Sequence, residues 1–199
     1  MKILIPTCRD REQVRPLVCS ILEHSPGHSV FASCLKESAS VNRNACLEKL
    51  TIGETAIMVD DDITGFYRGW IDDLTRGLMD FPNAVMASAR LLKPNGKFGQ
   101  TSSDCYAPEP AEIPVNMLPT AAIAFRYTGL DFDTRYVGSG WEDTDYVRQL
   151  KYDNPDAVLI QSNRCRLTHR NEMKHQGGTN WEHNKAYFFS KWNAHAQHA

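Results

Sequence analysis

Three consecutive carboxylates, Asp60, Asp61 and Asp62, follow the apolar run at residues 55–59. The run reads as a buried strand, and the ligands of α/β sheets bind beyond the carboxyl ends of such strands. Neighbouring carboxylates repel one another, and a divalent cation relieves this repulsion while completing its own shell with the phosphates of a substrate. The pattern therefore indicates a site for a metal and a nucleotide, with a solvated acidic loop as the alternative interpretation.

A second acidic cluster occupies residues 138–145 and holds two glycines, one tryptophan and three carboxylates. Glycine allows the backbone to approach a ligand closely, and Trp141 offers a flat apolar face for a sugar ring or a base. Glu142 and Asp143 fall in the first turn of an expected helix, where the helix dipole favours carboxylates. Ordinary capping would explain the acidic residues equally well, but it does not require a tryptophan beside glycines. We therefore interpret the cluster as part of a site.

Two basic residues are further candidates. His169 ends an extended piece at residues 164–168, and imidazole is a common nitrogen ligand of divalent metals; a surface histidine is the alternative. Arg43 precedes the strand at 55–59 and could bind a diphosphate through two parallel hydrogen bonds. The alternative for Arg43 is the solvent side of a helix whose N-cap is Ser40.

The composition limits the class of protein. A chain of 199 residues with 42% hydrophobic and 23% charged residues is typical of one ordinary globular domain. The net charge of −2 and the lack of a basic run exclude a general nucleic-acid-binding patch. No apolar stretch is long enough to span a bilayer, and the N-terminus does not read as a signal peptide. Six scattered cysteines without a CxxC pair predict free thiols and a cytoplasmic location.

The elements that must position these residues alternate between strand and helix in the first half of the chain. This alternation implies right-handed crossovers and a mainly parallel sheet flanked by helices. In the second half, we expect a long loop at 102–119 that could close over the site. The expected strands are 2–6, 30–35, 55–59, 84–89 and 120–127, with extended pieces at 157–161 and 164–168. The expected helices are 12–24, 40–50, 64–79 with Thr64 as the N-cap, 142–150 and 180–192.

Taken together, the motifs resemble those of glycosyltransferases with the GT-A fold, near the large inverting family 2, over nearly the whole chain. Asp60 and Asp62 match the DxD motif, in which the first carboxylate lies near the ribose and the last binds the metal. Glu142 and Asp143 resemble the ED motif, also found in β-1,4-galactosyltransferases, whose aspartate is the catalytic base. His169 matches a later metal-binding histidine. The remaining matches, which we assign to substrate binding, are Pro6, Thr7, Arg9, Arg43, Asp61, Gly140 and Trp141, and segment 184–192 resembles the usual ending.

The resemblance implies a Rossmann-like α/β domain over residues 1–199, with a mainly parallel sheet and a small mixed sheet on the acceptor side. Residues 1–100 would bind the nucleotide-sugar, and residues 101–199 would bind the acceptor and carry catalysis. It also implies Mn²⁺ or Mg²⁺ on Asp62 and His169, a UDP-sugar as donor, and a single displacement with Asp143 as base. Arg43 or Arg9 would assist electrostatically. The acceptor stays open among a glycan, a protein, a lipid and a modified DNA base.

The base of the nucleotide also stays open, because the expected strand 30–35 lacks the acidic residue that often binds it in this family. Two other classes fit part of the pattern. A nucleotidyltransferase would use similar acids, but it usually has a glycine-rich loop after the first strand, and residues 7–11 contain no glycine. A non-catalytic sugar-nucleotide-binding module would use Trp141 and Trp70 as platforms, and the presence of both acidic clusters argues against it.

Overall fold

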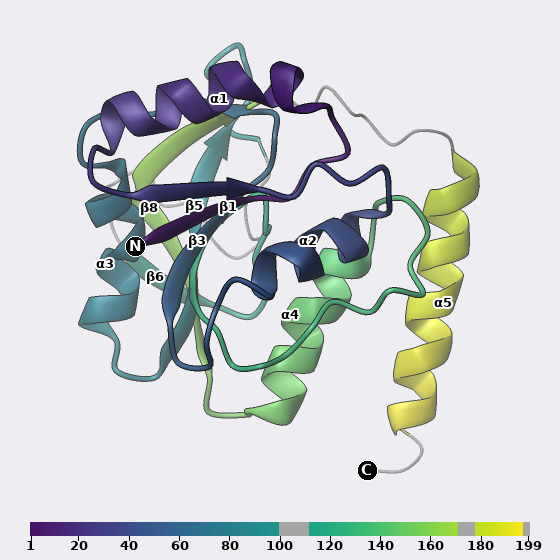
Figure 1. Cartoon of the computed structure of the whole chain (residues 1–199). Helices are drawn as coiled ribbons and strands as arrows, with labels where there is room; N and C mark the ends of the chain where they lie inside the picture. Colours follow the sequence, from purple (N-terminus) through teal and green to yellow (C-terminus); the bar gives the residue numbers. More distant parts are fainter. Residues whose placement is uncertain (100–111, 171–177, 197–199) are drawn as a thin grey trace.

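The computed structural model describes residues 1–99, 112–170 and 178–196, and within them a central sheet, most of whose strands run in the same direction, is flanked by helices (Figure 1). The eight strands are ordered β2-β1-β3-β7-β5-β8-β4, and β6 also pairs with β8. Their bounds are β1 Lys2–Ile5, β2 Ser29–Ala32, β3 Thr55–Val59, β4 Ile63–Thr64, β5 Ala84–Leu92, β6 Glu112–Val115, β7 Ala122–Arg126 and β8 Val158–His169. The helices are α1 Arg11–His24, α2 Ala39–Leu47, α3 Trp70–Asp80, α4 Glu142–Asp153 and α5 Gly178–Ala196.

Strand directions explain where the site forms. β1 pairs in parallel with β2 and β3, so the carboxyl ends of these strands lie at one edge of the sheet. β5 and β8 also pair in parallel, and β7 runs antiparallel between β3 and β5. The antiparallel strands β4 and β6 both attach to β8. The small mixed sheet that we expected is thus an extension of the main sheet.

Helices cover both faces of the sheet, which is why most positions of its central strands are apolar. Successive side chains of a strand point to opposite faces. Ile3 and Ile5 accordingly pack in one core with α1 and α3, whereas Leu4 packs in the other core with α2 and α4. α5 stands at the side of the molecule, beside the chain that leads into α4 (Figure 1).

One expected helix begins later than its periodicity indicates. Thr64 belongs to β4, and α3 begins at Trp70 after Gly69, whose φ is 95°. Trp70 is fully buried, and its Nε1 donates a hydrogen bond to the Ser25 hydroxyl at 2.6 Å. The proposal of Trp70 as a sugar platform was therefore wrong, because its spacing with the other apolar residues of this segment reflects packing in the core.

The expected N-cap of α2 was also wrong. Ser38 is the N-cap, and its hydroxyl accepts a hydrogen bond from the Val41 N–H at 3.4 Å. Ser40 lies inside the helix and is fully buried. This start turns Arg43 toward the sheet, so the alternative that placed Arg43 on the solvent side is wrong as well.

Other expectations were tested in part. β8 is one strand with a register shift where we expected two extended pieces. Residues 102–111 of the expected 102–119 loop lie outside the described residues, and Glu112–Val115 form β6. Five cysteines are free, as predicted, while Cys105 lies outside the described residues. Within the described part of the chain, no helix combines the length and the apolar composition that crossing a bilayer requires.

Candidate active site

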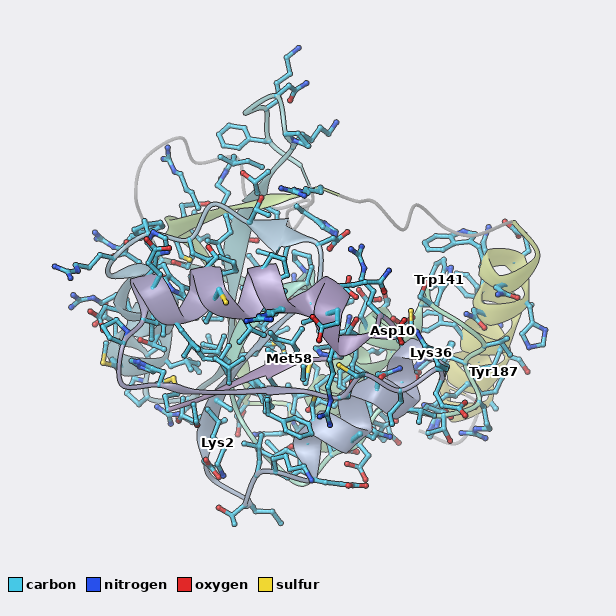
Figure 2. The ribbon with its side chains drawn as sticks, turned by 45° about the horizontal axis from the view of Figure 1, so that its top comes forward. Lys2, Asp10, Lys36, Met58, Trp141 and Tyr187 are labelled. Carbon is cyan, nitrogen blue, oxygen red and sulfur yellow. The ribbon has the colours of Figure 1, made fainter. Side chains whose placement is uncertain are left out.

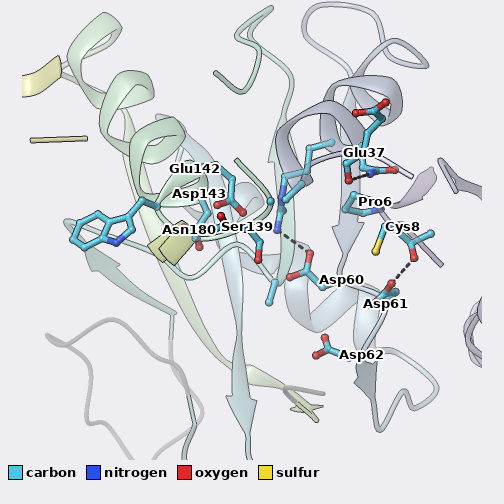
Figure 3. Close-up of a pocket in the computed structure, with 18 of the residues that line it drawn as sticks. Pro6, Cys8, Glu37, Asp60, Asp61, Asp62, Ser139, Glu142, Asp143 and Asn180 are labelled. Carbon is cyan, nitrogen blue, oxygen red and sulfur yellow. Dashed lines mark hydrogen bonds and ion pairs between the residues drawn. The ribbon is translucent and has the colours of Figure 1, made fainter. Parts of the chain in front are cut away.

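A cavity of about 570 Å³ lies beyond the carboxyl ends of β1 and β3 and reaches the first turn of α4 (Figure 3). The acidic triplet stands on one side of it, and the carboxylates that begin α4 stand on the other. The cavity brings together residues from five separate motifs of the sequence. Of the sequence-predicted site residues, those that line it are Pro6, Thr7, Arg43, Asp60, Asp61, Asp62, Gly140, Trp141, Glu142, Asp143 and His169. Arg9 reaches the site through an ion pair with Asp61.

Arg43 lies between the two acidic clusters. It is 5% exposed, and its Nη2 donates to Asp60 Oδ1 at 2.9 Å. Burial lowers the pKa of Arg43, but the charges of Asp60, Glu142 and Asp143 outweigh this effect and raise it. Burial raises the pKa of Asp60 to about 6 in spite of the arginine. Arg43 therefore stays charged where both clusters meet, which is where a diphosphate would need a cation.

Asp61 fastens the turn after β1. Its Oδ2 accepts a hydrogen bond from the Thr7 hydroxyl and lies 3.3 Å from Arg9 Nε. The Thr7 hydroxyl also accepts from the Arg9 N–H at 3.0 Å, and the Thr7 N–H donates to the Ser33 hydroxyl at 3.1 Å. Asp61 therefore joins Thr7, which lines the cavity, and Arg9, which does not, to the acidic triplet.

Asp62 and His169 form the third pair. Asp62 is buried, and its Oδ1 lies 3.1 Å from His169 Nε2. The antiparallel pairing of β4 with the end of β8 brings the two residues together. Burial lowers the pKa of His169, but the hydrogen bond and the charge of Asp62 outweigh it, so the pKa is raised.

Each carboxylate of the triplet thus has a basic partner, so these partners offset part of the repulsion that we inferred from the sequence, without a metal ion. Among the described residues, no group of three or more histidine, cysteine or acidic side chains is placed to hold a metal. Asp62 and His169 remain two adjacent oxygen and nitrogen donors. Two donors fit a hard cation that takes its other ligands from phosphates and water.

The second acidic pair begins α4. Trp141 precedes it in the left-handed conformation, with φ at 72°. Glu142 is 3% exposed, and its Oε2 has no hydrogen-bond partner among the described residues. Burial and the charge of Asp143 raise the pKa of Glu142, while Arg43 opposes the shift. Asp143 is half-buried, and its Oδ1 accepts from the Thr144 N–H at 2.7 Å. This pair can accept a proton from a group bound in the cavity.

Asn184 of α5 fixes the loop that leads into this pair. The side chain is fully buried, and its Nδ2 donates to the carbonyls of Val137 and Gly140, each at 2.9 Å. Its Oδ1 accepts from the Val137 N–H at 3.0 Å. A weaker contact at 3.4 Å joins Nδ2 to the Ser139 carbonyl. One amide therefore holds the backbone just before Trp141.

The two glycines of this loop allow α5 to pack closely. Gly138 and Gly140 have φ values of 64° and 105°. A Cβ on Gly138 would lie 2.9 Å from Asn180 Nδ2, and a Cβ on Gly140 would lie 2.7 Å from Trp181 Cε3. We had assigned these glycines to the close approach of a ligand. The structure shows that their close neighbour is the first turn of α5.

Further contacts anchor α5 to the same region of the chain. Lys191 Nζ lies 2.7 Å from Asp145 Oδ2, and Trp192 Nε1 donates to Asp145 Oδ1 at 2.8 Å. The Tyr187 hydroxyl donates to Asp133 Oδ2 at 2.8 Å. Trp141 and Tyr187 accordingly lie on the side of the molecule that carries α5 (Figure 2). The closing helix therefore supports the segment that carries the candidate base.

The sequence did not reveal every residue of the cavity wall. Asn180 and Trp181 line it from α5, and Glu37 lines it from the loop after β2. Asn42 holds that loop, because its Nδ2 donates to the Glu37 carbonyl at 3.1 Å. The sequence motif at residues 184–192 begins only at Asn184, so no pattern assigned the first turn of α5 to the site.

No protein-family model and no curated protein matches the sequence. The chain is similar to solved structures at low identity. GalNAc-T7 with UDP, GalNAc and Mn²⁺ is 14% identical over 94% of this chain and 41% of that one, with a TM-score of 0.60. Residues 1–349 of TarS from S. aureus are 12% identical over 85% and 60%, with a TM-score of 0.56. Glucosyl-3-phosphoglycerate synthase from Mycobacterium tuberculosis, with Mg²⁺ and UDP, is 13% identical over 95% and 78%, with a TM-score of 0.54.

This likeness confirms the predicted GT-A fold, and it does not distinguish family 2 from other families with that fold. The chain spans less than half of the GalNAc-T7 structure and three fifths of the TarS fragment. Activity and substrates therefore have to be argued from the site.

Proposed function

We propose that this chain of the GT-A fold transfers a sugar from a nucleotide-sugar, a UDP-sugar in our proposal, to an acceptor hydroxyl with inversion at the anomeric carbon. One observation carries the proposal: a single cavity holds the Asp62–His169 pair, Arg43 and the acidic pair Glu142 and Asp143. Two of the similar structures contain UDP together with Mn²⁺ or Mg²⁺. These are ligands that a metal-binding pair beside a buried arginine would suit.

The donor half comprises residues 1–100 in this proposal. Pro6, Thr7, Asp60 and Asp61 line the end of the cavity where the nucleotide would bind, and Arg9 supports them through Asp61. Asp62 and His169 would hold Mn²⁺ or Mg²⁺, which when bound stabilises negative charge on the departing diphosphate. Arg43 adds a fixed positive charge that needs no reorganisation during the reaction.

The acceptor half comprises residues 101–199. Asp143 would remove the proton of the acceptor hydroxyl as general base, and that oxygen would form the new bond to the anomeric carbon as the bond to the diphosphate breaks. Glu142 is the second candidate base, because its carboxylate is buried beside Asp143 and one of its oxygens has no partner among the described residues. Gly140 and Trp141 place this pair at the cavity wall.

The proposal is tested by incubating the protein with a panel of nucleotide-sugars and Mn²⁺ while the release of nucleoside diphosphate is followed. NMR of the product reports its anomeric configuration, and retention would contradict the inverting mechanism. Release of pyrophosphate from a sugar phosphate and a nucleoside triphosphate would instead identify a nucleotidyltransferase. Donor binding without turnover under any condition would favour a binding module.

The five free cysteines among the described residues support our proposal of a reducing compartment such as the cytoplasm.

A further inference from the structure

The cavity extends beyond the acidic pair to the first turn of α5, where Asn180 and Trp181 line it. The donor scheme above uses neither residue. The indole of Trp181 packs directly over Gly140, and its ring centroid lies 5.4 Å from that of Trp141. Two indoles therefore stand together beside Asp143, on the side of the acidic pair that belongs to the acceptor half.

We propose that this end of the cavity is an acceptor subsite for an uncharged sugar ring, with Trp181 as the stacking surface. The acceptor would then be a saccharide hydroxyl. This inference rests on the proposed function, since it assigns the acceptor of the same reaction.

The lining matches the chemistry of a sugar ring. Such a ring has a flat face of C–H groups and a rim of hydroxyls, each of which can both donate and accept hydrogen bonds. Trp181 supplies a flat apolar surface, while Asn180 and Ser139 carry side chains that can both donate and accept. Asp143 accepts only, as a base facing a hydroxyl must.

The aromatic surface is also held in place before any ligand binds. The ring of Trp141 lies 5.1 Å from Phe188 and 5.6 Å from Phe189, so α5 supports it from behind. Asn184 fixes the backbone on which Trp141 stands. A rigid aromatic surface loses little conformational entropy on binding, which favours weakly interacting ligands such as saccharides.

A nucleic acid could also stack a base on an indole, but the acidic residues of this site would repel its phosphates. Glu142 and Asp143 line the wall beside the two indoles. The buried cation on which these two carboxylates act, Arg43, is already paired with Asp60. The whole chain carries a net charge of −2. Nucleic-acid affinity depends on neutralising phosphates with basic groups, so an uncharged saccharide is favoured.

The first test is direct binding. Saturation-transfer NMR would be recorded with methyl glycosides of glucose, galactose and N-acetylglucosamine, in the presence of UDP and Mn²⁺. We expect at least one glycoside to bind the unmodified protein and to lose about tenfold in affinity with Trp181→Ala. His183→Ala is the matched control, because His183 carries an aromatic ring at an exposed position of the same helix and does not line the cavity. UDP affinity, measured by calorimetry, should be unchanged in both variants.

The second test is turnover, with the glycoside as acceptor and the release of UDP as the readout. Trp181→Ala should raise the KM for the glycoside, and Trp181→Phe should recover part of the loss. The inference is overturned if no glycoside binds the unmodified protein or if Trp181→Ala binds glycosides normally. It is also overturned if an oligonucleotide with hydroxymethylated bases, but no glycoside, accelerates UDP release. Glycoside binding that depends on Trp181, without UDP release from any donor, would contradict the proposed function and leave the saccharide subsite standing.

Discussion

Asn184→Ala tests separately whether the loop that leads into α4 is held in position and whether the proposed donor binds. The substitution removes three hydrogen bonds of 2.9–3.0 Å to the backbone of Val137 and Gly140, at a side chain that is fully buried. A typical hydrogen bond contributes about 1 kcal/mol net, so the expected loss in the free energy of unfolding is about 3 kcal/mol. In a domain of this size, that loss lowers Tm by about 6–12 °C.

Turnover should fall further than stability alone explains. Without the amide, the loop that carries Trp141 and the acidic pair can shift, and a misplacement of about 1 Å can cost about 100-fold in rate. The affinity for UDP with Mn²⁺ should be retained. The pairing of β4 with β8 positions Asp62 and His169, and Arg43 is held by α2 and by its ion pair with Asp60. The assays are calorimetry for UDP and UDP release for turnover, both at a temperature where the variant is folded.

Two further variants sharpen this test. Asn184→Asp keeps the size of the side chain and can still accept a hydrogen bond from the Val137 N–H. Its second carboxylate oxygen, however, would face the two carbonyls that accept hydrogen bonds from the Asn184 amide in the unmodified protein. It should therefore lose as much turnover as the alanine variant. Asn193→Ala, at an exposed position of the same helix, should behave like the unmodified protein. The reasoning is refuted if Asn184→Ala turns over normally while folded, or if its UDP affinity falls as much as its rate.

Two other outcomes follow from the same structure. Asp143→Asn should lose about 10²–10⁴-fold in turnover, as expected for a general base, and only about 0.3–1 kcal/mol in stability. The matched control Asp153→Asn, at the exposed end of α4, should keep its rate. Near-normal turnover in Asp143→Asn would remove Asp143 from the mechanism. Burial raises the pKa of Glu112 to about 7, above its value of about 4.3 in an unfolded chain, so this residue contributes stability below pH 4 that is lost as the pH rises through 7. Glu112→Gln should therefore flatten the dependence of Tm on pH between about 4 and 7, and an unchanged slope in thermal melts would contradict the assignment.

The side of the cavity that carries the acidic triplet could be predicted from the sequence because its signals are local. An apolar strand and the acidic residues that follow it are adjacent in the chain, and the parallel pairing of β1 with β3 brings Thr7 to Asp61. The helix at 64–79 was misplaced because its apolar spacing continued through Gly65 and Gly69, whose positive φ values end any helix there. The two glycines were the sequence signal that the helix begins later, at Trp70.

The contribution of α5 to the cavity could not be predicted, because its contacts join distant parts of the chain. Asn184 bonds to Val137, 47 positions earlier, and Trp181 packs over Gly140. A glycine in a sequence does not show whether a ligand or a helix approaches it. The pairing of each acidic residue of the triplet with its own basic partner is likewise a property of the folded chain, since Arg9 and His169 lie 160 positions apart.

The most direct test of the proposed donor site is calorimetry of UDP binding with and without Mn²⁺. We expect Mn²⁺ to strengthen UDP binding to the unmodified protein, because Asp62 and His169 would hold the cation against the diphosphate. Asp62→Asn should bind UDP equally with and without the metal, while Asp72→Asn, at an exposed position of α3, should keep the enhancement. Enhancement by Mn²⁺ that persists in Asp62→Asn, or no enhancement in the unmodified protein, would contradict the metal-dependent donor site.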